Sequence, residues 1–480
     1  MPTESTRDHP DVHRLAPVLA IDCSQVLRTR NRTGIPRVVR NLALHGPDHR
    51  DVGIEAWPVV LTFRGYCRVP RSWLVPARRG PLGRLLRSGK MLALAALAFG
   101  ARACKSEIRT LGILIPVGLR PLAKRAARGT IAALRKANRA FVRTRAAAGK
   151  TFLTLRLWGQ RVAFAPGDTL LLCDSNWDEV VLWKWIAELR ARGGLVGAVV
   201  YDLIPVRRPE FVDAGLYNVF DAHLRRLSRE CDFVIGISRD TSRDFLEFAR
   251  SSDRPGWTED RTGSFRLGAG GWATDASEAT PRCTAVLAAC AGVPIFLVVG
   301  TIEIRKNLSA VLGAFETLWN QGETPALVVV GKPGFGGKAA IEQMLRSPSF
   351  GRRLFWLADA SDSDLEACYR AAAALIMPSR AEGFGLPVVE ALQRGKAVLA
   401  SDIPTHREIA DGFCGFFDPS RQDELEMLVR AHIRNGRGRE LRPLEEFKWP
   451  AWSESARECL CECRRMIALG ARCSPGSPLH

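Results

Sequence analysis

Two carboxylates, Glu382 and Glu390, lie eight positions apart in the segment EGFGLPVVE. An apolar run at 374–377 precedes this segment, and Pro387 suits the first turn of a helix, where its missing N–H costs no hydrogen bond. The free N–H groups at a helix start attract anions, and a carboxylate one turn later can accept hydrogen bonds from sugar hydroxyls. The segment therefore predicts a ligand site at the carboxyl end of a strand in an α/β sheet.

The pattern E-G-F-G-L-P-x-x-E resembles the E-x7-E signature of the GT4 family, retaining glycosyltransferases that have the GT-B fold. The resemblance implies that Glu390 holds the ribose hydroxyls of a nucleotide. It also implies that Glu382 takes part in catalysis by positioning the donor sugar. The residues that join them would bind substrate as well: Gly383, Phe384, Gly385 and Leu386.

A second segment, 296–315, resembles the G-x-x-E-x-R-K-N segment of the same family. Arg305 and Lys306 precede apolar residues at helical spacing, where fixed cations and free backbone N–H groups suit a diphosphate. The resemblance makes both cations catalytic and Gly300 part of the substrate-binding turn. Many family members carry a further cation where Thr301 stands here, so phosphate neutralisation rests more on Arg305, Lys306 and the backbone.

Two segments of the first half continue the resemblance. TGIPR at 33–37 resembles the family's first glycine-bearing loop, in which Gly34 would let the backbone approach a ligand. GAVVYDLIPVRRPEF at 197–211 resembles bacterial O-antigen and exopolysaccharide mannosyltransferases of the family. Its Asp202 ends an apolar strand, where an unpaired carboxylate would be costly. Asp202 is either an acceptor for the ligand or a cap for the next turn.

Three further patterns have plain structural interpretations. Gly331 and Lys332 follow an apolar run where the family lines the nucleotide-base pocket, although a simple turn explains them equally well. Asp362 and Asp364 form a D-x-D pattern, but they directly precede a helical pattern, so helix capping explains them. In CLCEC, at 459–463, the first and last cysteines share one helix face and the middle one does not. We therefore expect no metal and no other cofactor, because GT-B enzymes generally handle the diphosphate with cations and helix dipoles.

Buried strand patterns alternate with helical patterns in both halves of the chain, which predicts two parallel, doubly wound sheets. With the resemblance, this gives an α/β protein of the GT-B fold, with two Rossmann-like domains facing across a cleft. The expected domains are 1–275 for the acceptor, 276–446 for the nucleotide sugar, and 447–480 for a helix that crosses back and a tail. The expected strands are 18–23, 57–63, 168–173, 196–203, 232–237, 295–299, 326–330, 353–357, 374–377, 397–401 and 413–417.

The basic charge of the chain is concentrated in one segment, 77–161, which the family resemblance does not cover. It holds 20 of the 69 Lys and Arg and one of the 50 Asp and Glu, so the rest of the chain is neutral overall. We favour a basic helical insert that contacts an anionic membrane surface. A solvated, arginine-rich insertion is the second interpretation. Nucleic-acid binding is the least favoured, because the insert has few aromatic residues, and no nucleic-acid partner is expected.

Composition limits where the protein works. The longest uncharged runs of the insert, 91–101 and 110–119, are shorter than the roughly 20 residues of a membrane-spanning helix. The first residues are polar and do not predict a signal peptide. An odd number of scattered cysteines, 13, favours a reducing compartment. We expect a cytoplasmic protein that lies peripherally on the inner face of the plasma membrane.

The resemblance implies transfer of a hexose from a nucleotide diphosphate sugar to a glycan or lipid-linked glycan, with retention at the anomeric carbon. The Asp-x-Ile-Pro segment at 202–205 tilts the donor toward GDP-mannose, and bacterial surface polysaccharide synthesis is the expected pathway. The alternative is a catalytically weakened sugar-nucleotide-binding or scaffold protein of a polysaccharide assembly complex.

Overall fold

The computed structural model describes residues 17–29, 34–75, 153–154, 156–157, 159–177, 179–252, 256–270, 278–436, 438 and 441–470. Most of the predicted insert, 77–161, lies outside these ranges, and so does its interpretation as a membrane-binding segment. Among the helices within the described ranges, each is too short or too polar to cross a lipid bilayer.

The first half of the chain forms a seven-stranded sheet with the order β3-β2-β1-β4-β5-β6-β7. The pairs from β2 to β7 are parallel. Buried apolar runs such as VLAID in β1 predict strands covered on both faces. All five strands expected here are confirmed, with ends shifted by at most three residues. The strands are β1 (Val18–Asp22), β2 (Glu55–Thr62), β3 (Gly65–Arg68), β4 (Thr169–Leu172), β5 (Leu195–Val200), β6 (Phe233–Gly236) and β7 (Thr262–Ser264).

Neither β3 nor β7, the two edge strands, is predicted from the sequence. The polar segment RSSDRPGWTEDRTG, at 250–263, predicts a flexible loop. β7 begins inside it at Thr262, so this prediction is wrong for the described residues of the segment. Trp257 is buried there, donates its Nε1–H to Ser228 O at 2.8 Å, and packs edge-to-face on Phe245. A three-residue strand has no apolar alternation of its own, so only its pairing with β6 reveals it.

The second half forms a six-stranded parallel sheet with the order β10-β9-β8-β11-β12-β13. All six expected strands are confirmed, and four of them have the predicted bounds. Phe296 and Phe315 meet edge-to-face at 5.6 Å in the core beneath this sheet. The strands are β8 (Ile295–Val299), β9 (Ala326–Val330), β10 (Leu354–Leu357), β11 (Ala374–Met377), β12 (Ala397–Ser401) and β13 (Gly415–Phe417).

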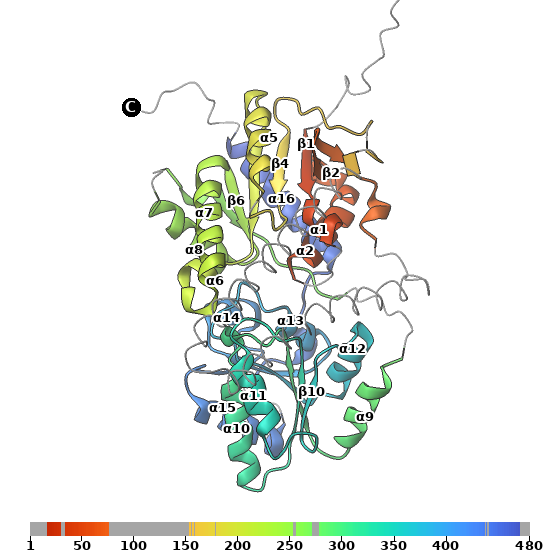
Figure 1. Ribbon diagram of the computed structural model, residues 1–480, viewed down its shortest axis with the longest axis vertical. Coiled ribbons are helices and arrows are strands. Elements are labelled where there is room, and N and C mark those ends of the chain that lie inside the picture. Colours follow the sequence, from red (N-terminus) through yellow and green to blue (C-terminus); the bar gives the residue numbers. More distant parts are fainter. Residues whose placement is uncertain are drawn as a thin grey trace, which may run out of the picture. The chain divides into compact units, whose positions relative to one another are not determined.

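Helices connect the strands of both sheets (Figure 1). Those between β1 and β7 are α1 (Ser24–Thr29), α2 (Ile35–His45), α5 (Val180–Ala191), α6 (Ile204–Arg207), α7 (Ala214–Glu230) and α8 (Arg239–Arg250). The later ones are α9 (Pro281–Ala289), α10 (Leu308–Asn320), α11 (Lys338–Arg346), α12 (Asp362–Ala371), α13 (Leu386–Gln393), α14 (Pro404–Ala410), α15 (Gln422–Asn435) and α16 (Trp452–Gly470).

The last helix, α16, returns to the first sheet. It packs against α2, β6 and β7, and in Figure 1 its blue ribbon lies among the elements of the first half. Arg464 donates to Val52 O at 2.8 Å. Cys459 and Cys463 are fully buried while Cys461 is exposed, which confirms the predicted helix face. The expected crossover helix is therefore present.

Leu27–Thr29, the end of β2, β3 and the described residues up to Val162 form a compact unit of their own. Leu153 and Leu157, at the described end of the predicted insert, pack into its apolar core. Arg156 lies over the Trp73 ring, 4.8 Å from its centroid. The predicted domain boundaries after residues 275 and 446 stay predictions.

Candidate active site

The loop between β11 and α13 carries Glu382 and leads to Glu390 inside the helix. A Cβ on Gly383 would lie 2.0 Å from Tyr201 O, so only glycine lets the loop pass this close to the end of β5. The Phe384 ring is buried and packs edge-to-face on Trp449 at 5.8 Å. The side chain of Phe384 therefore packs inside the protein. Only the backbone of this predicted substrate-binding residue can face a ligand.

Glu382 sits between the two predicted cations. Arg305 Nη1 donates to Glu382 Oε2 at 2.9 Å, and Lys306 Nζ forms an ion pair with Glu382 Oε1. Arg305 also pairs with Glu303 through its Nε at 2.9 Å. The cations precede α10 in a single 3₁₀ turn, Ile304–Lys306, as the sequence predicts. Their contact with Glu382 brings both cations to the 382–385 loop, and their role in binding a diphosphate stays a prediction.

Burial and charge oppose each other at this cluster. The Glu382 side chain is only 7% exposed, and burial by itself raises its pKa. Lys306 and Arg305 outweigh burial and hold the pKa of Glu382 well below its usual range. Burial lowers the pKa of Lys306, although Glu382 opposes that shift, since one carboxylate is shared between two cations. Glu382 is therefore an anion at neutral pH.

Arg305 and Lys306 can donate further hydrogen bonds besides those they make to Glu382. An ammonium has three donors and a guanidinium five, so their capacity exceeds the bonds they make to carboxylates. Lys306 Nζ would also lie 3.7 Å from a Cβ placed on Gly300, which brings the ammonium against the predicted substrate-binding turn. The Lys306 ammonium therefore lies beside both this turn and Glu382.

Glu390 lies in a different setting, although it begins in the same segment. Its Oε1 accepts from Arg37 Nη1 at 2.7 Å, and its Oε2 accepts from the Tyr369 hydroxyl at 3.0 Å. Arg37 also donates to Gly270 O at 3.3 Å and lies over the Trp452 ring. Burial, and then the negative charge of Glu390, raise the pKa of Tyr369 well above its usual value.

Sequence reasoning missed Arg37 and Tyr369. Arg37 is the last residue of TGIPR, but only Gly34 of that segment was assigned a role; Gly34 caps the start of α2 and Arg37 reaches Glu390. A basic residue one turn into that helix was the available signal. No local pattern in the sequence predicts the contact of Tyr369 with Glu390, because it is a hydrogen bond between two different helices, α12 and α13.

Of the two roles left open by the sequence, Asp202 takes the capping role. Its Oδ1 accepts from Ile204 N at 3.0 Å, so it caps the next turn. It also lines a cavity of about 290 Å³ together with Arg305. Burial raises the pKa of Asp202, and the nearby Arg305 charge opposes the shift. Capping is confirmed, and contact with a ligand stays a prediction.

The same cavity has an apolar and aromatic wall. Trp177 and Phe220 pack edge-to-face there at 5.1 Å, and Phe211 adds a third ring. His223 also lines it; burial lowers the pKa of that imidazole to about 4. Aromatic faces with a few polar groups are typical of pockets that take small organic ligands.

Gly331, another glycine predicted to bind substrate, is explained by packing. A Cβ on Gly331 would lie 1.8 Å from Gly300 O, so two turns meet here through bare backbone. Lys332 O accepts from Ile302 N at 2.7 Å, which ties the same turns together. The assignment of Gly331 and Lys332 to a nucleotide-base pocket stays a prediction.

The D-x-D pattern serves α12. Ser361 and Asp364 form a reciprocal capping box, and Asp364 Oδ1 also accepts from Thr280 N at 2.7 Å. The predicted capping role is confirmed. Across the part of the chain that the structure describes, no three His, Cys, Asp or Glu side chains gather as a metal site would require.

A buried histidine beside the loop was also missed. His406 Nδ1 lies 3.0 Å from Ser401 O, so its proton is on Nδ1, and Nε2 is left as an acceptor. Within the described residues Nε2 has no hydrogen-bond partner, and it would lie 3.4 Å from a Cβ on Gly385. Burial lowers the pKa of His406, so this acceptor is neutral.

A comparison with known protein families finds a match in the second half of the chain, which carries Glu382 and Glu390. Residues 286–442 match the family model described as glycosyl transferases, group 1. This range is a group 1 glycosyl transferase domain. Within the range lie Gly300, Arg305, Lys306, Gly331, Lys332, the 382–386 loop and Glu390; Gly34 and Asp202 lie outside it.

Curated relatives extend the similarity beyond this glycosyl transferase domain. A serotype-specific mannosyltransferase, WbdA of Escherichia coli, is 32% identical over 323 residues, which are 65% of this chain and 38% of WbdA. An O-antigen chain mannosyltransferase B of Escherichia coli is 28% identical over 160 residues, or 32% of this chain and 42% of that protein. The chain spans about two fifths of the length of these relatives.

Solved structures of low sequence identity share the fold of this chain. Sucrose-phosphate synthase from Thermosynechococcus elongatus has a TM-score of 0.52 at 15% identity, covering 95% of this chain and 98% of that one. Anabaena HepE in complex with UDP and glucose has a TM-score of 0.50 at 14% identity, covering 96% and 100%. The expected α/β fold of the GT-B type, with two parallel sheets, is confirmed.

Proposed function

We propose that the protein transfers a hexose, with mannose favoured, from a nucleotide diphosphate sugar to a glycan or lipid-linked glycan with retention of configuration. The observation that carries this proposal is the contact of Glu382 with both Arg305 and Lys306, on the loop that leads to Glu390. Bacterial surface polysaccharide synthesis is the pathway that fits the named relatives, which are a serotype-specific and an O-antigen mannosyltransferase.

The chemistry follows from where charge develops. As the bond from C1 to the diphosphate oxygen breaks, positive charge develops on the sugar ring and negative charge on the leaving group. Lys306, Arg305 and the N-terminal amides of α13 are fixed donors for that negative charge, and such preorganised donors usually give the largest catalytic term. The acceptor hydroxyl forms the new bond on the same face and passes its proton to the leaving phosphate.

Glu382 is suited to hold the sugar and not to attack it. Two cations engage its carboxylate, which lowers its nucleophilicity, and its depressed pKa keeps it ionised. An ionised carboxylate accepts hydrogen bonds from sugar hydroxyls and stabilises positive charge on the ring. Retention then arises through the leaving phosphate on one face, without a glycosyl-enzyme intermediate.

The acceptor belongs on the first half. The cavity beside Asp202 offers aromatic faces and the carboxylate residues Asp202, Asp213 and Glu303, and Arg305 also lines it. A sugar ring packs well on aromatic faces while its hydroxyls bond to a carboxylate. The Asp202 carboxylate would accept a hydrogen bond from an acceptor hydroxyl.

The direct test is turnover. The purified chain is incubated with GDP-mannose, UDP-glucose and other sugar nucleotides, with lipid-linked glycans as acceptors, and the product linkage is read by NMR. We expect transfer from GDP-mannose and an α-linked product. Binding of sugar nucleotide with no transfer and no hydrolysis would favour the alternative, a sugar-nucleotide-binding scaffold protein.

No divalent metal takes part in this proposal, because the cations and helix dipole described above neutralise the diphosphate. Activity is therefore expected to survive exhaustive treatment with EDTA. A loss of activity that Mg²⁺ or Mn²⁺ restores would contradict this expectation.

The protein would act at the cytoplasmic face of the membrane through the basic segment 77–161. Replacing the nine Lys and Arg of residues 120–145 with Gln should release the protein from vesicles that contain phosphatidylserine and leave nucleotide binding unchanged. Vesicles of phosphatidylcholine alone are the matched control. Undiminished binding of the variant to anionic vesicles would refute this role.

A further inference from the structure

The N-terminus of α8, in the first half, is hydrogen-bonded to the loop that carries Glu382. Ser238 Oγ lies 3.0 Å and Thr241 Oγ1 3.3 Å from Gly383 O, and both are within donating distance. The two hydroxyls are 2.9 Å apart, so one can donate to the other while the second donates to the carbonyl. The carbonyl that follows Glu382 is thus held from a distant part of the chain.

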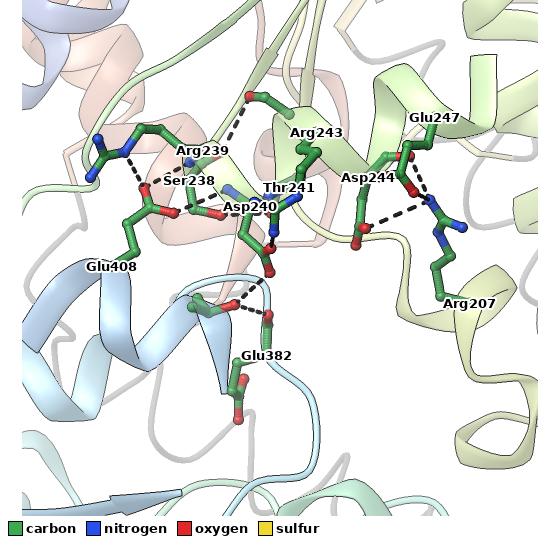
Figure 2. A network of polar contacts seen from close by, with 12 residues as sticks. Arg207, Ser238, Arg239, Asp240, Thr241, Arg243, Asp244, Glu247, Glu382 and Glu408 are labelled. Atoms are coloured by element: carbon green, nitrogen blue, oxygen red, sulfur yellow. Dashed lines mark hydrogen bonds and ion pairs between the residues drawn. The ribbon is translucent and has the colours of Figure 1, made fainter. Parts of the chain in front are cut away.

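A carboxylate from the second half caps the same helix. Glu408, on α14, accepts from Arg239 N at 2.7 Å and from Asp240 N at 3.0 Å (Figure 2). These are N–H groups of the first turn of α8, which have no partner inside the helix and carry the positive end of its dipole. Charge-assisted bonds of this kind are about twice as strong as neutral ones.

Thr405 connects the two sets of contacts. Its Oγ1 lies 2.8 Å from Glu382 O and 3.1 Å from Asp240 Oδ2, and it donates its proton to one of them. The carbonyls of Glu382 and Gly383 are therefore both within reach of hydroxyls that the α8 terminus fixes. Figure 2 shows the Glu382 carboxylate on the other side of its backbone, directed away from α8.

Helix capping alone does not explain this arrangement. Ser238 already caps α8, because its Oγ accepts from Thr241 N at 3.0 Å. The helix has its own local cap at its third N–H group, and Glu408 satisfies the first two N–H groups in addition. What the extra contacts add is a fixed position of the 382–385 loop relative to α8.

We propose that Glu408, Thr405 and the Ser238–Thr241 hydroxyl pair form a latch that positions the Glu382 loop for catalysis. This inference rests on the proposed function. The latch residues are positioning residues: they act on the loop backbone from the side opposite the Glu382 carboxylate. A catalytic group must be held within about 0.5 Å of its productive place, so a loosened loop lowers turnover without removing a ligand contact.

The latch also makes the donor site depend on the first half of the chain. Asp240 of α8 contacts α14 twice, through its N–H to Glu408 and through its carboxylate to Thr405. Closure that completes a catalytic site is a common gating device in enzymes. The consequence here is that the backbone of the Glu382 loop is positioned from the first half, while Arg305 and Lys306 hold its carboxylate from the second.

The test compares latch variants with a control on the same helix. Glu408→Gln and the double variant Ser238→Ala/Thr241→Val remove the latch, and Ser238→Thr keeps a hydroxyl. Glu247→Gln is the control, because Glu247 pairs with Arg207 at 2.6 Å on the surface of α8 and does not touch the loop (Figure 2). For each variant we measure kcat, KM, affinity for the free nucleoside diphosphate, and the thermal midpoint.

We expect the latch variants to lose about tenfold to a hundredfold in kcat. Affinity for the nucleoside diphosphate, which lacks the sugar, should stay within about twofold of the unaltered protein, and Ser238→Thr should retain turnover. Unchanged kcat in both latch variants would overturn the proposal. So would a loss of kcat that is matched by Glu247→Gln or by an equal loss of nucleoside-diphosphate affinity.

A second measurement does not depend on turnover. Hydrogen–deuterium exchange of the amides at 383–386 should be faster in Glu408→Gln than in Glu247→Gln, with the rest of the second sheet unchanged. Equal exchange in the two variants would overturn the latch. If the unaltered protein transfers no sugar from any nucleotide, the proposed function fails, while this exchange experiment still decides whether the latch holds the loop.

Discussion

Glu382 and Glu390 lie in one short segment, but their carboxylates are held by different means. Glu382 is held by two cations from the 3₁₀ turn of its own half, Arg305 and Lys306. Glu390 is held by one cation from 353 positions away, Arg37, and by the neutral Tyr369 hydroxyl. The first site is a charge cluster of local origin, and the second joins the two halves of the chain.

The difference predicts different tasks. A carboxylate that shares two cations adjusts the charge that a diphosphate meets, so under the proposed function Glu382 would act on chemistry at the leaving group and the sugar. A carboxylate held by one guanidinium and one hydroxyl has a fixed direction, which suits recognition of ribose hydroxyls. Substitutions that affect one glutamate and spare the other test this division.

The largest effect should come from Lys306→Ala. This change removes a buried ammonium from the leaving-group site, and we expect turnover to fall by about a thousandfold. The thermal stabilisation that a nucleoside diphosphate gives should be lost far more than the stabilisation by a nucleoside, which is read by thermal shift. Lys338→Ala, at a side chain that is 88% exposed in the same half, is the control. If a nucleoside diphosphate stabilises Lys306→Ala as much as the unaltered protein, Lys306 does not bind the diphosphate, and the proposed difference between the two glutamates is wrong.

Glu382→Gln should separate chemistry from binding. We expect turnover to fall by about a hundredfold, because the anion beside the sugar is lost. Nucleoside-diphosphate affinity should rise several-fold, because Arg305 and Lys306 no longer share their charge with a carboxylate. Calorimetry measures this affinity. In Glu390→Gln the affinity for the nucleoside diphosphate should fall. Weaker diphosphate binding in Glu382→Gln would contradict the assignment of the cations.

Arg37→Met tests the contact between the halves. It leaves Glu390 buried without its cation, and we expect the free energy of unfolding to fall by about 2–3 kcal/mol. The double variant Arg37→Met/Glu390→Gln should recover most of that loss in chemical denaturation. Pyrophosphate affinity should not change, since the Glu382 cluster is intact. If the double variant is as unstable as the sum of the two single ones, the pair is not coupled.

The fold could be read from the sequence where local pattern decides structure. Ala374–Met377 and Ala397–Ser401 have the predicted bounds, because a strand buried on both faces is a continuous apolar run. Arg305 and Lys306 were predicted beside the Glu382 loop from their place before a helix and from a family pattern. β7 could not be predicted, because its pairing with β6 and not its own residues makes it a strand.

The parts of the site that the sequence did not reveal are long-range contacts between polar groups. Ser238 follows a buried strand, a place where a serine favours a helix start, and it does cap α8, but its contact with Gly383 O joins residues 145 positions apart. Glu408 on Arg239 N and Arg37 on Glu390 are of the same kind. No local periodicity encodes which distant backbone group a side chain will meet.

The smallest expected effect is the contribution of Glu382 to the loss of folding stability at low pH. The folded pKa of Glu382 lies well below its ordinary value of 4.5, so its contribution to stability is fully present above pH 4.5 and is lost as the pH falls toward the folded pKa. At pH 3 the loss should be roughly 2 kcal/mol relative to pH 7, about 1.4 kcal/mol for each pH unit below 4.5. Glu382→Gln removes this titration, so its unfolding free energy should fall less between pH 7 and pH 3 than that of the unaltered protein. Equal losses, measured by urea denaturation at both pH values, would mean that Arg305 and Lys306 do not hold the carboxylate ionised, and the contrast with Glu390 would then rest on geometry alone.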